Sequence, residues 1–296
     1  MNAGGPAGPD GRAVLLMLAS TLCFSGMHGA IRHVSADLHA YEIAFFRNFF
    51  GLLVFVPVLV RHGLAPLRTR RFPLHLLRAA INIVSMMCFF YALGIGPLTE
   101  ISTLSFTSPI FAAILAVFFF GERIGRAKAA AIALGFVGMV VVLRPGQEAL
   151  GLGPLLSLAS AVIWAFALMV IKELSKTDSA ITIAAYMNIL LAPLALGPAI
   201  LVWRWPSAET YAWLVALAVM GTSGHILLNQ ALKEAEASAI MPLDFVRIIW
   251  IAAIAYFGFG ETPDILTWAG AGLICLSAFW IARTGRPRGR RRAAHL

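Results

Sequence analysis

Two oppositely charged side chains, Asp244 and Arg247, stand three residues apart in the apolar stretch MPLDFVRIIW at positions 241–250. Residues with this spacing share a helix face and can form an ion pair. If the stretch crosses a membrane, each charge costs about 2.5–3.5 kcal/mol, and such residues usually face a bundle interior or a water-filled cavity. Two roles are therefore open. Either Arg247 contacts a solute while Asp244 pairs with it or titrates, or the pair only holds two parts of the protein together.

Further polar side chains stand in other apolar runs, often three or four residues apart, which places them on one helix face. Arg47 either lines a cavity or extends its side chain to the membrane surface, and Glu42 is the acid with which it could pair. Arg78 is expected to extend to the surface. Trp164 and Tyr186 could stack on a solute, and packing is their alternative role. Besides Arg247 and Asp244, the candidate residues for a substrate cavity are Arg47, Asn82, Ser85, Tyr91, Ser105, Ser108, Trp164, Tyr186, His225 and Asn229.

Proton coupling requires a titratable group inside the membrane. The candidates are Asp244, His28 and His225, and a structural hydrogen bond is the alternative role of each histidine. Serines stand at positions 102, 105 and 108 directly before Pro109, so a kink is expected there. The residues expected to have structural roles are Pro109, Asn48, Asn188, Glu122 and Glu261.

No motif for enzyme chemistry accompanies these residues. The sequence contains no phosphate-binding loop, no zinc-ligand spacing and no nucleophile elbow. Cys23, Cys88 and Cys275 lie inside apolar runs and do not form a disulfide framework. We therefore expect no catalytic residue, no metal site and no cofactor, and an ATP-driven pump is disfavoured.

The composition identifies the elements that must position these side chains. Of 296 residues, 60% are hydrophobic and 12% are charged, whereas soluble proteins contain about 25% charged residues. Apolar runs of the roughly 20 residues that a membrane helix needs follow one another almost without interruption. The start of the chain lacks the basic segment of a cleaved signal peptide, so the first run is expected to be retained. The chain is predicted to be an all-α polytopic membrane protein with ten spans, at 13–33, 41–60, 74–95, 98–120, 126–144, 153–173, 180–203, 209–232, 237–259 and 265–283.

The distribution of basic residues predicts the orientation of these spans. The net charge is +9, and the basic residues stand mostly between apolar runs and in the tail RPRGRRR at 286–292. With both termini in the cytoplasm, the only basic residues in outer loops are Arg32, Arg144 and Arg204, which satisfies the positive-inside rule. We therefore expect an inner-membrane protein with both termini cytoplasmic. The basic charge is assigned to contact with anionic lipid, and no nucleic-acid partner is expected.

The chain contains an internal repeat. LASTLCFSGMHGAIRHVS at 18–35 matches LASAVIWAFALMVIKELS at 158–175 with an offset of 140, and Gly121-Glu122 matches Gly260-Glu261 with an offset of 139. Each repeat has five spans, an odd number, so the second must enter the membrane from the opposite side. The expected organisation is a cytoplasmic segment at 1–12, five-helix repeats at 13–146 and 153–285, and a basic cytoplasmic tail at 286–296.

Inverted repeats have a direct use in transport. Two similar halves can open alternately to either side of the membrane around a site near its midplane. The offset of 140 also pairs Asn48 with Asn188, which suggests a shared structural role at the axis between the halves. A duplicated bundle that does not transport, such as a membrane enzyme or a receptor, is the alternative.

Several motifs resemble a known family. They are FFRNFFGLL at 45–53, LSFTSPIFAAILAVFFFGERI at 104–124, GFVGMVVVLRPG at 135–146 and MPLDFVRIIWIAAIAYFGFGE at 241–261. With these motifs the chain resembles the drug/metabolite transporter superfamily, and more narrowly bacterial proteins with two EamA domains. The resemblance implies that spans one to four and six to nine surround a central cavity, with spans five and ten at the periphery. Arg-Asn in span two and Asp-x-x-Arg in span nine are similar to a subgroup that includes candidate S-adenosylmethionine and riboflavin carriers.

The predicted function is secondary transport of a small polar or amphipathic metabolite by alternating access. Three intramembrane arginines against one acid indicate a solute with an anionic group, such as a carboxylate. Export is one direction considered; the alternative is import of a cofactor-like solute such as S-adenosylmethionine or riboflavin. From other classes, a membrane-embedded enzyme, a non-transporting receptor and a partner-dependent scaffold stay open. The expected partners are a small-molecule solute and the lipid bilayer, with protons, a counter-solute and a second copy in a homodimer as further candidates.

Overall fold

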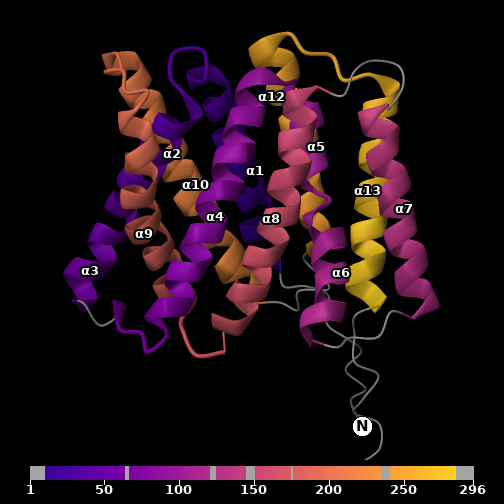
Figure 1. Ribbon diagram of the computed structural model, residues 1–296, viewed down its shortest axis with the longest axis horizontal. Coiled ribbons are helices and arrows are strands. Elements are labelled where there is room, and N and C mark those ends of the chain that lie inside the picture. The colour runs from indigo at the N-terminus through magenta and orange to yellow at the C-terminus, as the bar shows by residue number, and fades with distance from the viewer. Residues whose placement is uncertain are drawn as a thin grey trace, which may run out of the picture.

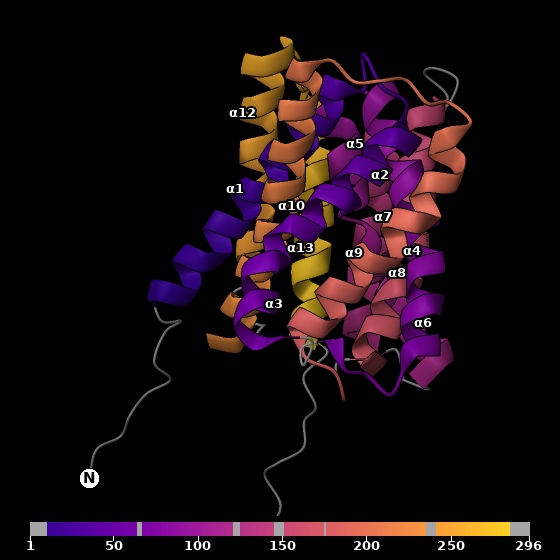
Figure 2. The ribbon, with the colours of Figure 1, turned by 90° about the vertical axis from the view of Figure 1, so that its left-hand side faces the viewer.

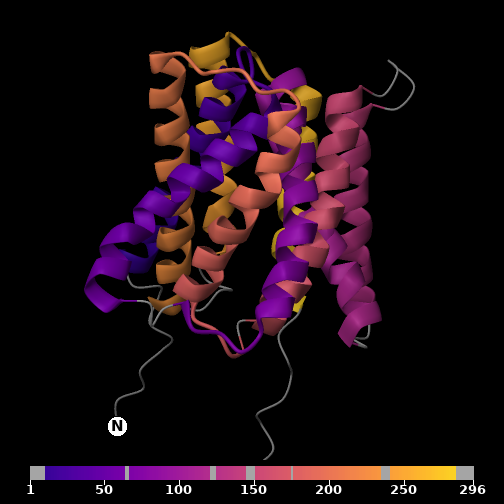
Figure 3. The same cartoon turned by 60° about the vertical axis from the view of Figure 1, so that its left-hand side comes forward.

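The computed structural model is a bundle of helices that run roughly along one direction, with short connections at both ends (Figures 1, 2 and 3). It describes residues 11–63, 67–120, 125–144, 151–174, 176–234 and 241–284, and no strand occurs in these ranges. Seven described helical stretches are long and apolar enough to cross a membrane. The predicted all-α membrane fold is therefore confirmed. The count of ten crossings stays a prediction, because the remaining spans are shorter or broken.

The helices follow the predicted spans closely, with breaks inside three of them. The first half consists of α1 (Gly11–Val34), α2 (Ala40–Gly51), η1 (Leu52–Phe55), α3 (Val56–His62), α4 (Phe72–Ile95), α5 (Leu98–Ser105), α6 (Ser108–Phe120) and α7 (Arg126–Leu143). The second half consists of α8 (Leu152–Leu174), α9 (Ala180–Ile200), α10 (Ala208–Glu234), η3 (Met241–Val246), α12 (Arg247–Phe259) and α13 (Ile265–Thr284).

Local sequence signals set several of these boundaries. The Ser179 hydroxyl accepts a hydrogen bond from the Thr182 amide at 3.1 Å and so caps the start of α9. The Glu42 carboxylate accepts from the His39 amide at 3.2 Å at the start of α2. At the other end, α12 stops at Gly260, whose φ of +65° is a left-handed conformation that glycine adopts without steric cost.

The helix packing repeats when the two halves are exchanged. In the repeat α1 corresponds to α8 and α10 to α4, and the structure packs α1 against α10 and α4 against α8. The corresponding pairs α2 and α9, and α7 and α13, also pack against each other. The halves also run in opposite directions, because α8 begins at the face where α1 and α4 end. We call the end of the bundle that carries Arg61, Arg68, Arg70, Arg71 and Arg126 the basic face, and the other end the opposite face.

Helices α7 and α13 pack side by side at one edge of the bundle (Figure 1), as the family resemblance implies for spans five and ten. Two glycines allow their close approach. A Cβ atom added at Gly270 would lie 2.4 Å from the Val142 side chain and 2.8 Å from the Gly138 carbonyl oxygen. The Ser277 hydroxyl also donates to the Ala131 carbonyl at 2.6 Å across this contact.

Gly270→Ala is therefore expected to lower the free energy of unfolding by about 1–3 kcal/mol, the usual cost of overpacking. Gly272→Ala is the matched control on the same helix, because nothing lies within 4 Å of a Cβ atom at Gly272. The control should be neutral or stabilising by up to about 1 kcal/mol, since alanine favours helix more than glycine does. Thermal unfolding in detergent measures both, and equal effects of the two substitutions would contradict the close contact.

Candidate solute-binding site

Helices are broken at corresponding positions of the two halves. In the first half α5 ends at Ser105 and α6 begins at Ser108; in the second η3 ends at Val246 and α12 begins at Arg247. The repeat offset of 139 places Phe106-Thr107 on Phe245-Val246, and the rings of Phe106 and Phe245 lie 5.9 Å apart. Interrupted helices at corresponding positions of inverted repeats mark the binding sites of many transporters. The N-terminus of α6 lies at the first break, so its positive dipole end favours an anion there, whereas η3 continues directly into α12.

The break in the first half has a visible cause in the sequence. Pro109 has no N–H group, and its ring clashes with the carbonyl four residues earlier, that of Ser105. The Ser108 hydroxyl donates to this carbonyl at 2.5 Å, and the Thr107 hydroxyl donates to the Leu104 carbonyl at 2.6 Å. Ser105 similarly donates to the Ser102 carbonyl at 2.7 Å. The hydroxyls predicted to line a cavity at 105 and 108 therefore satisfy the backbone of the break.

Arg247 is the first residue of α12 and lies beside these breaks. Its Nη2 donates to Asp244 Oδ2 at 2.9 Å, so the ion pair that the spacing permits is present. The guanidinium carbon lies 4.6 Å from the centre of the Phe106 ring and 5.4 Å from that of Phe24. The side chain is 17% exposed, and its buried Nε has no acceptor among the described residues. The guanidinium thus lies against two aromatic rings with Nη2 bonded to Asp244, while its buried Nε is left without an acceptor among the described residues.

Two histidines lie near the cluster that Arg247 forms with Asp244, Phe24 and Phe106. The His225 ring on α10 lies edge-on to Phe24 at 4.8 Å between centroids. His28 on α1 is buried, with Nδ1 at 3.4 Å from the Ser102 hydroxyl and its ring 5.0 Å from Phe89. Of the two helices that carry these histidine candidates for proton coupling, α1 packs against α12, and each histidine ring has a neighbour that fixes it.

Arg47 on α2 forms a second polar cluster, between the two halves. Its Nη1 donates to the side-chain oxygen of Asn48 at 2.9 Å and to that of Asn188 at 3.2 Å. The side chain is 4% exposed, so the alternative in which it extends to the membrane surface is wrong. Glu42 does not pair with it; its carboxylate accepts instead from the backbone amides of His39 and Arg204. The two asparagines related by the repeat thus share one buried cation.

The prediction that Arg78 extends to the surface is also wrong. Its side chain is buried, and Nη1 donates to the Ile183 carbonyl at 2.8 Å while Nη2 lies 3.5 Å from the Met187 sulfur. Position along a helix did not reveal that this residue faces α9. Among the described residues no ion pair involves Arg47 or Arg78. Two buried cations on adjacent helices therefore lack a described acidic partner.

The remaining candidates lie apart from these clusters. The buried Ser85 hydroxyl donates to the Ser160 carbonyl at 3.0 Å and joins α4 to α8. The Tyr91 ring lies 5.7 Å from that of His39, and the Tyr186 hydroxyl donates to the Leu67 carbonyl at 2.8 Å. Asn82 is buried in α4 and Trp164 half-buried in α8. The Asn229 side chain and Glu122 lie outside the described residues.

Glu261 lies at the opposite face, at the end of α12. Its Oε2 accepts from the Leu98 amide at 2.8 Å, at the first residue of α5, and its Oε1 lies 3.5 Å from Arg32 Nη2 at the end of α1. A carboxylate at a helix N-terminus satisfies free amides and interacts favourably with the helix dipole. Glu261 therefore ties α1, α5 and α12 together. A hollow of about 550 Å³ adjoins it, lined also by Thr99, Glu100 and Asp264.

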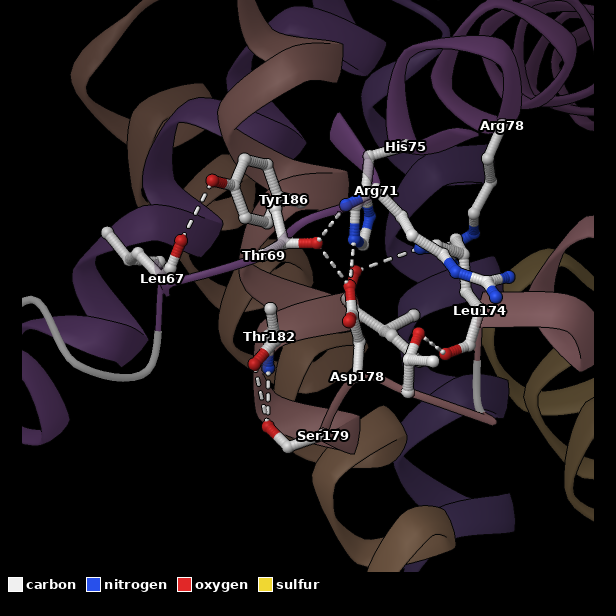
Figure 4. A network of polar contacts seen from close by, with 12 residues as sticks. Leu67, Thr69, Arg71, His75, Arg78, Leu174, Asp178, Ser179, Thr182 and Tyr186 are labelled. Carbon is white, nitrogen blue, oxygen red and sulfur yellow. Dashed lines mark hydrogen bonds and ion pairs between the residues drawn. The ribbon is translucent and has the colours of Figure 1, made fainter. Parts of the chain in front are cut away.

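A buried polar network at the basic face was missed by sequence reasoning (Figure 4). Asp178 Oδ2 accepts from the Thr69 hydroxyl at 2.6 Å and lies 2.7 Å from His75 Nε2. His75 is 2% exposed, and its ring stacks on Tyr186 at 4.6 Å. The network joins the link between α3 and α4 to the link between α8 and α9. The only available signal in the sequence was His75 near the start of an apolar run. Its partner, Asp178, is 103 residues away.

Asp178→Asn is expected to lower the free energy of unfolding by about 1.5 kcal/mol at neutral pH, because hydrogen bonds to a charged group are worth about 1.5–3 kcal/mol. Burial raises the pKa of the Asp178 carboxyl, but hydrogen bonds from Thr69 and His75 lower it by more, so the net pKa lies below the ordinary value. The stabilisation is therefore complete above about pH 4 and is lost as the pH falls through the lowered pKa. Unfolding of wild type and variant from pH 8 to pH 3 measures this. Glu209→Gln, at an exposed acid, should show no comparable loss.

Comparison with known proteins identifies related chains. The sequence profile described as "EamA-like transporter family" matches residues 11–144 and 151–283. An S-adenosylmethionine uptake transporter of Rickettsia bellii is 32% identical over 84% of this chain and 86% of its own length. A riboflavin transporter of Vibrio cholerae is 28% identical over 95% of this chain and 96% of its own. A pseudopaline exporter, CntI, of Pseudomonas aeruginosa is 29% identical over 92% of this chain and 96% of its own.

The fold is also similar to a solved structure. A chain described only as "Crystal structure of protein" superposes with a TM-score of 0.66 over 92% of this chain and 98% of its own, at 18% sequence identity. At this identity the likeness concerns the fold alone. The two matches to the family profile end at residue 144 and begin again at residue 151.

Proposed function

The chain belongs to the EamA-like transporter family, and we propose that it carries a carboxylate-bearing solute across the membrane by alternating access, without ATP. The observation that carries this proposal is the state of Arg247. It is held by Asp244 and by two aromatic rings, its side chain is 17% exposed, and its buried Nε has no acceptor among the described residues. A carboxylate would complete its hydrogen bonds with favourable geometry.

Charge balance around the two clusters supports an anionic group on the solute. Arg47, Arg78 and Arg247 carry three positive charges, and Asp244 is the acid found in an ion pair with one of them in the described residues. The N-terminus of α6 adds positive potential at the first break. Buried charges without partners are costly, so a bound anion would lower the free energy of this arrangement.

The activities named for the relatives indicate the rest of the solute. Phe24 and Phe106 are buried against Arg247, so they position the guanidinium. S-adenosylmethionine combines an amino acid carboxylate with an adenine ring, and relatives from Rickettsia named as its uptake transporters are 32–33% identical to this chain. We therefore take S-adenosylmethionine uptake as the first candidate activity. Riboflavin, which has a flat ring and no carboxylate, is the second, and the related exporter leaves direction to be measured.

The packing supports alternating access. Helix contacts repeat when the halves are exchanged, and the helix breaks of both halves meet at Phe106 and Phe245. Two halves of similar structure can exchange conformations, so that the solute site opens first to one face of the membrane and then to the other. The expected location is the bacterial inner membrane with both termini in the cytoplasm, because the positive charge gathers at the basic face.

Purified protein in liposomes tests this function. Radiolabelled S-adenosylmethionine and riboflavin are offered separately, and the label inside is analysed after uptake. A transporter accumulates one of them chemically unchanged, and empty liposomes or liposomes with Arg247→Lys accumulate far less. Conversion of the solute would favour a membrane enzyme. Binding without accumulation would favour a receptor or a scaffold that needs a partner.

Asp244, His28 and His225 are the proposed groups for proton coupling. If Asp244 exchanges a proton during transport, an imposed pH gradient should accelerate wild-type uptake several-fold, and Asp244→Asn should abolish this acceleration while exchange of solute for solute continues. Proteoliposomes with a pH jump measure both rates. Acceleration that persists in Asp244→Asn would move the coupling role to the histidines, and the absence of any acceleration in wild type would leave the protein uncoupled from protons.

A further inference from the structure

A hollow of about 430 Å³ opens at the basic face, outside the central clusters. Its lining residues come from two connections that are far apart in sequence. They are Arg68, Thr69, Arg70 and Arg71 before α4, and Thr177 and Asp178 before α9. Figure 4 shows Thr69, Arg71 and Asp178 of this lining converging from the two connections.

The charge of this lining is positive and largely unneutralised. Asp178 accepts hydrogen bonds from Thr69 and His75, and Arg71 Nη1 donates to Glu173 at 3.1 Å. Glu173 is itself shared, because it also pairs with Lys176. Arg68 and Arg70 are exposed, and neither takes part in an ion pair within the described ranges. Two guanidinium groups therefore remain available to an anion from outside the chain.

Apolar surface begins directly beside these arginines. Phe72 and Leu76, one turn apart on α4, are 49% and 46% exposed, and Ile181 on α9 is 41% exposed. Phe72 directly follows Arg71, and Ile181 stands three residues after Asp178, so exposed apolar side chains adjoin both connections in sequence. A matching ligand has an anionic head and an apolar body. A small anion without an apolar body would gain nothing from contact with these exposed apolar side chains.

We propose that this hollow binds the phosphate headgroup of an anionic phospholipid, whose acyl chains lie along α4 and α9. Guanidinium groups bind phosphate oxygens through paired hydrogen bonds, and arginines next to membrane helices attract anionic lipid. The lining includes Thr69 and Asp178, which already join the two connections. A bound lipid would therefore favour the conformation seen here, in which these connections are held together.

Binding to purified protein in neutral detergent tests this site. Phosphatidylglycerol, phosphatidylcholine and inorganic phosphate are added separately, and native mass spectrometry and thermal unfolding report binding. We expect phosphatidylglycerol to bind more tightly than phosphatidylcholine and to raise the melting temperature. Arg68→Gln/Arg70→Gln should weaken phosphatidylglycerol binding by about 25-fold, since each arginine near the surface contributes about fivefold at low salt. Arg61→Gln/Arg126→Gln removes the same charge from exposed residues of the same face outside the hollow and should bind like wild type.

Hydrogen exchange gives a second readout that does not depend on affinity alone. Phosphatidylglycerol should slow amide exchange in residues 67–71 and 176–179 of wild type, and it should not do so in Arg68→Gln/Arg70→Gln. The proposal is overturned if both double variants lose binding equally, because the effect is then total charge. It is also overturned if phosphatidylcholine binds as tightly, or if inorganic phosphate stabilises the protein as much as the lipid does, because the site would then serve a soluble anion.

Discussion

Arg247→Lys is expected to weaken solute binding about 30-fold while the protein stays folded. Lysine keeps the positive charge and can still pair with Asp244, which lies 2.9 Å from the arginine. It lacks the planar group that stacks between Phe24 and Phe106 and the free Nε donor. Loss of one hydrogen bond to a charged group and of the stacking amounts to about 2 kcal/mol, which corresponds to the 30-fold change. Ligand-dependent thermal stabilisation and the KM of uptake measure it.

Two further variants test whether the loss of binding is specific to the Arg247 guanidinium. Arg126→Lys, at an exposed arginine at the start of α7, should bind solute like wild type. Phe106→Leu keeps Arg247 and removes one ring, so it should weaken binding less, by about fivefold. If Arg247→Lys binds as tightly as wild type, the pair with Asp244 is only a structural link and the proposed site falls. The family assignment would be unaffected.

Much of the architecture could be predicted because it depends on composition and repetition. Apolar runs fix helices in a membrane, since every backbone polar group must be satisfied within the segment. The break before Pro109 was visible because proline removes a donor. The break at 241–246 was not predicted, and span nine was expected to be continuous. There the deviation follows the repeat, because η3 corresponds to the end of α5.

The site was harder to predict because its contacts connect residues far apart in sequence. Asp244 and Arg247 are local, so their spacing sufficed. Arg47 and Asn188 are 141 residues apart, and the repeat paired Asn188 with Asn48 without indicating that both would turn to one arginine. The prediction for Arg78 was wrong for the same reason. Which face of α4 meets α9 depends on how α4 is rotated about its own axis. Contacts of this kind follow from tertiary packing, which periodicity alone does not determine.

Asn188→Leu is expected to lower the free energy of unfolding by about 3 kcal/mol, the second large effect. The substitution keeps the branched shape and the number of side-chain heavy atoms but removes an acceptor from Arg47, which is 4% exposed and has no ion pair among the described residues. Taking a partner from a buried charge typically costs 3–5 kcal/mol. Denaturant titration in mixed micelles measures the loss.

We expect the loss of stability in Asn188→Leu to come from the charge of Arg47. The variant Arg47→Met separates this electrostatic cause from an effect on packing. If the cost of Asn188→Leu comes from an unsatisfied guanidinium, Arg47→Met/Asn188→Leu should be more stable than Asn188→Leu alone, with a coupling energy of about 1.5 kcal/mol or more. Additive losses would instead assign Asn188 to packing. Transport measurements separate the role of Arg47 in stability from its role in solute binding. Arg47→Met should lose solute affinity even when the double variant regains stability, because the cation that Asn48 and Asn188 hold between the halves is then absent.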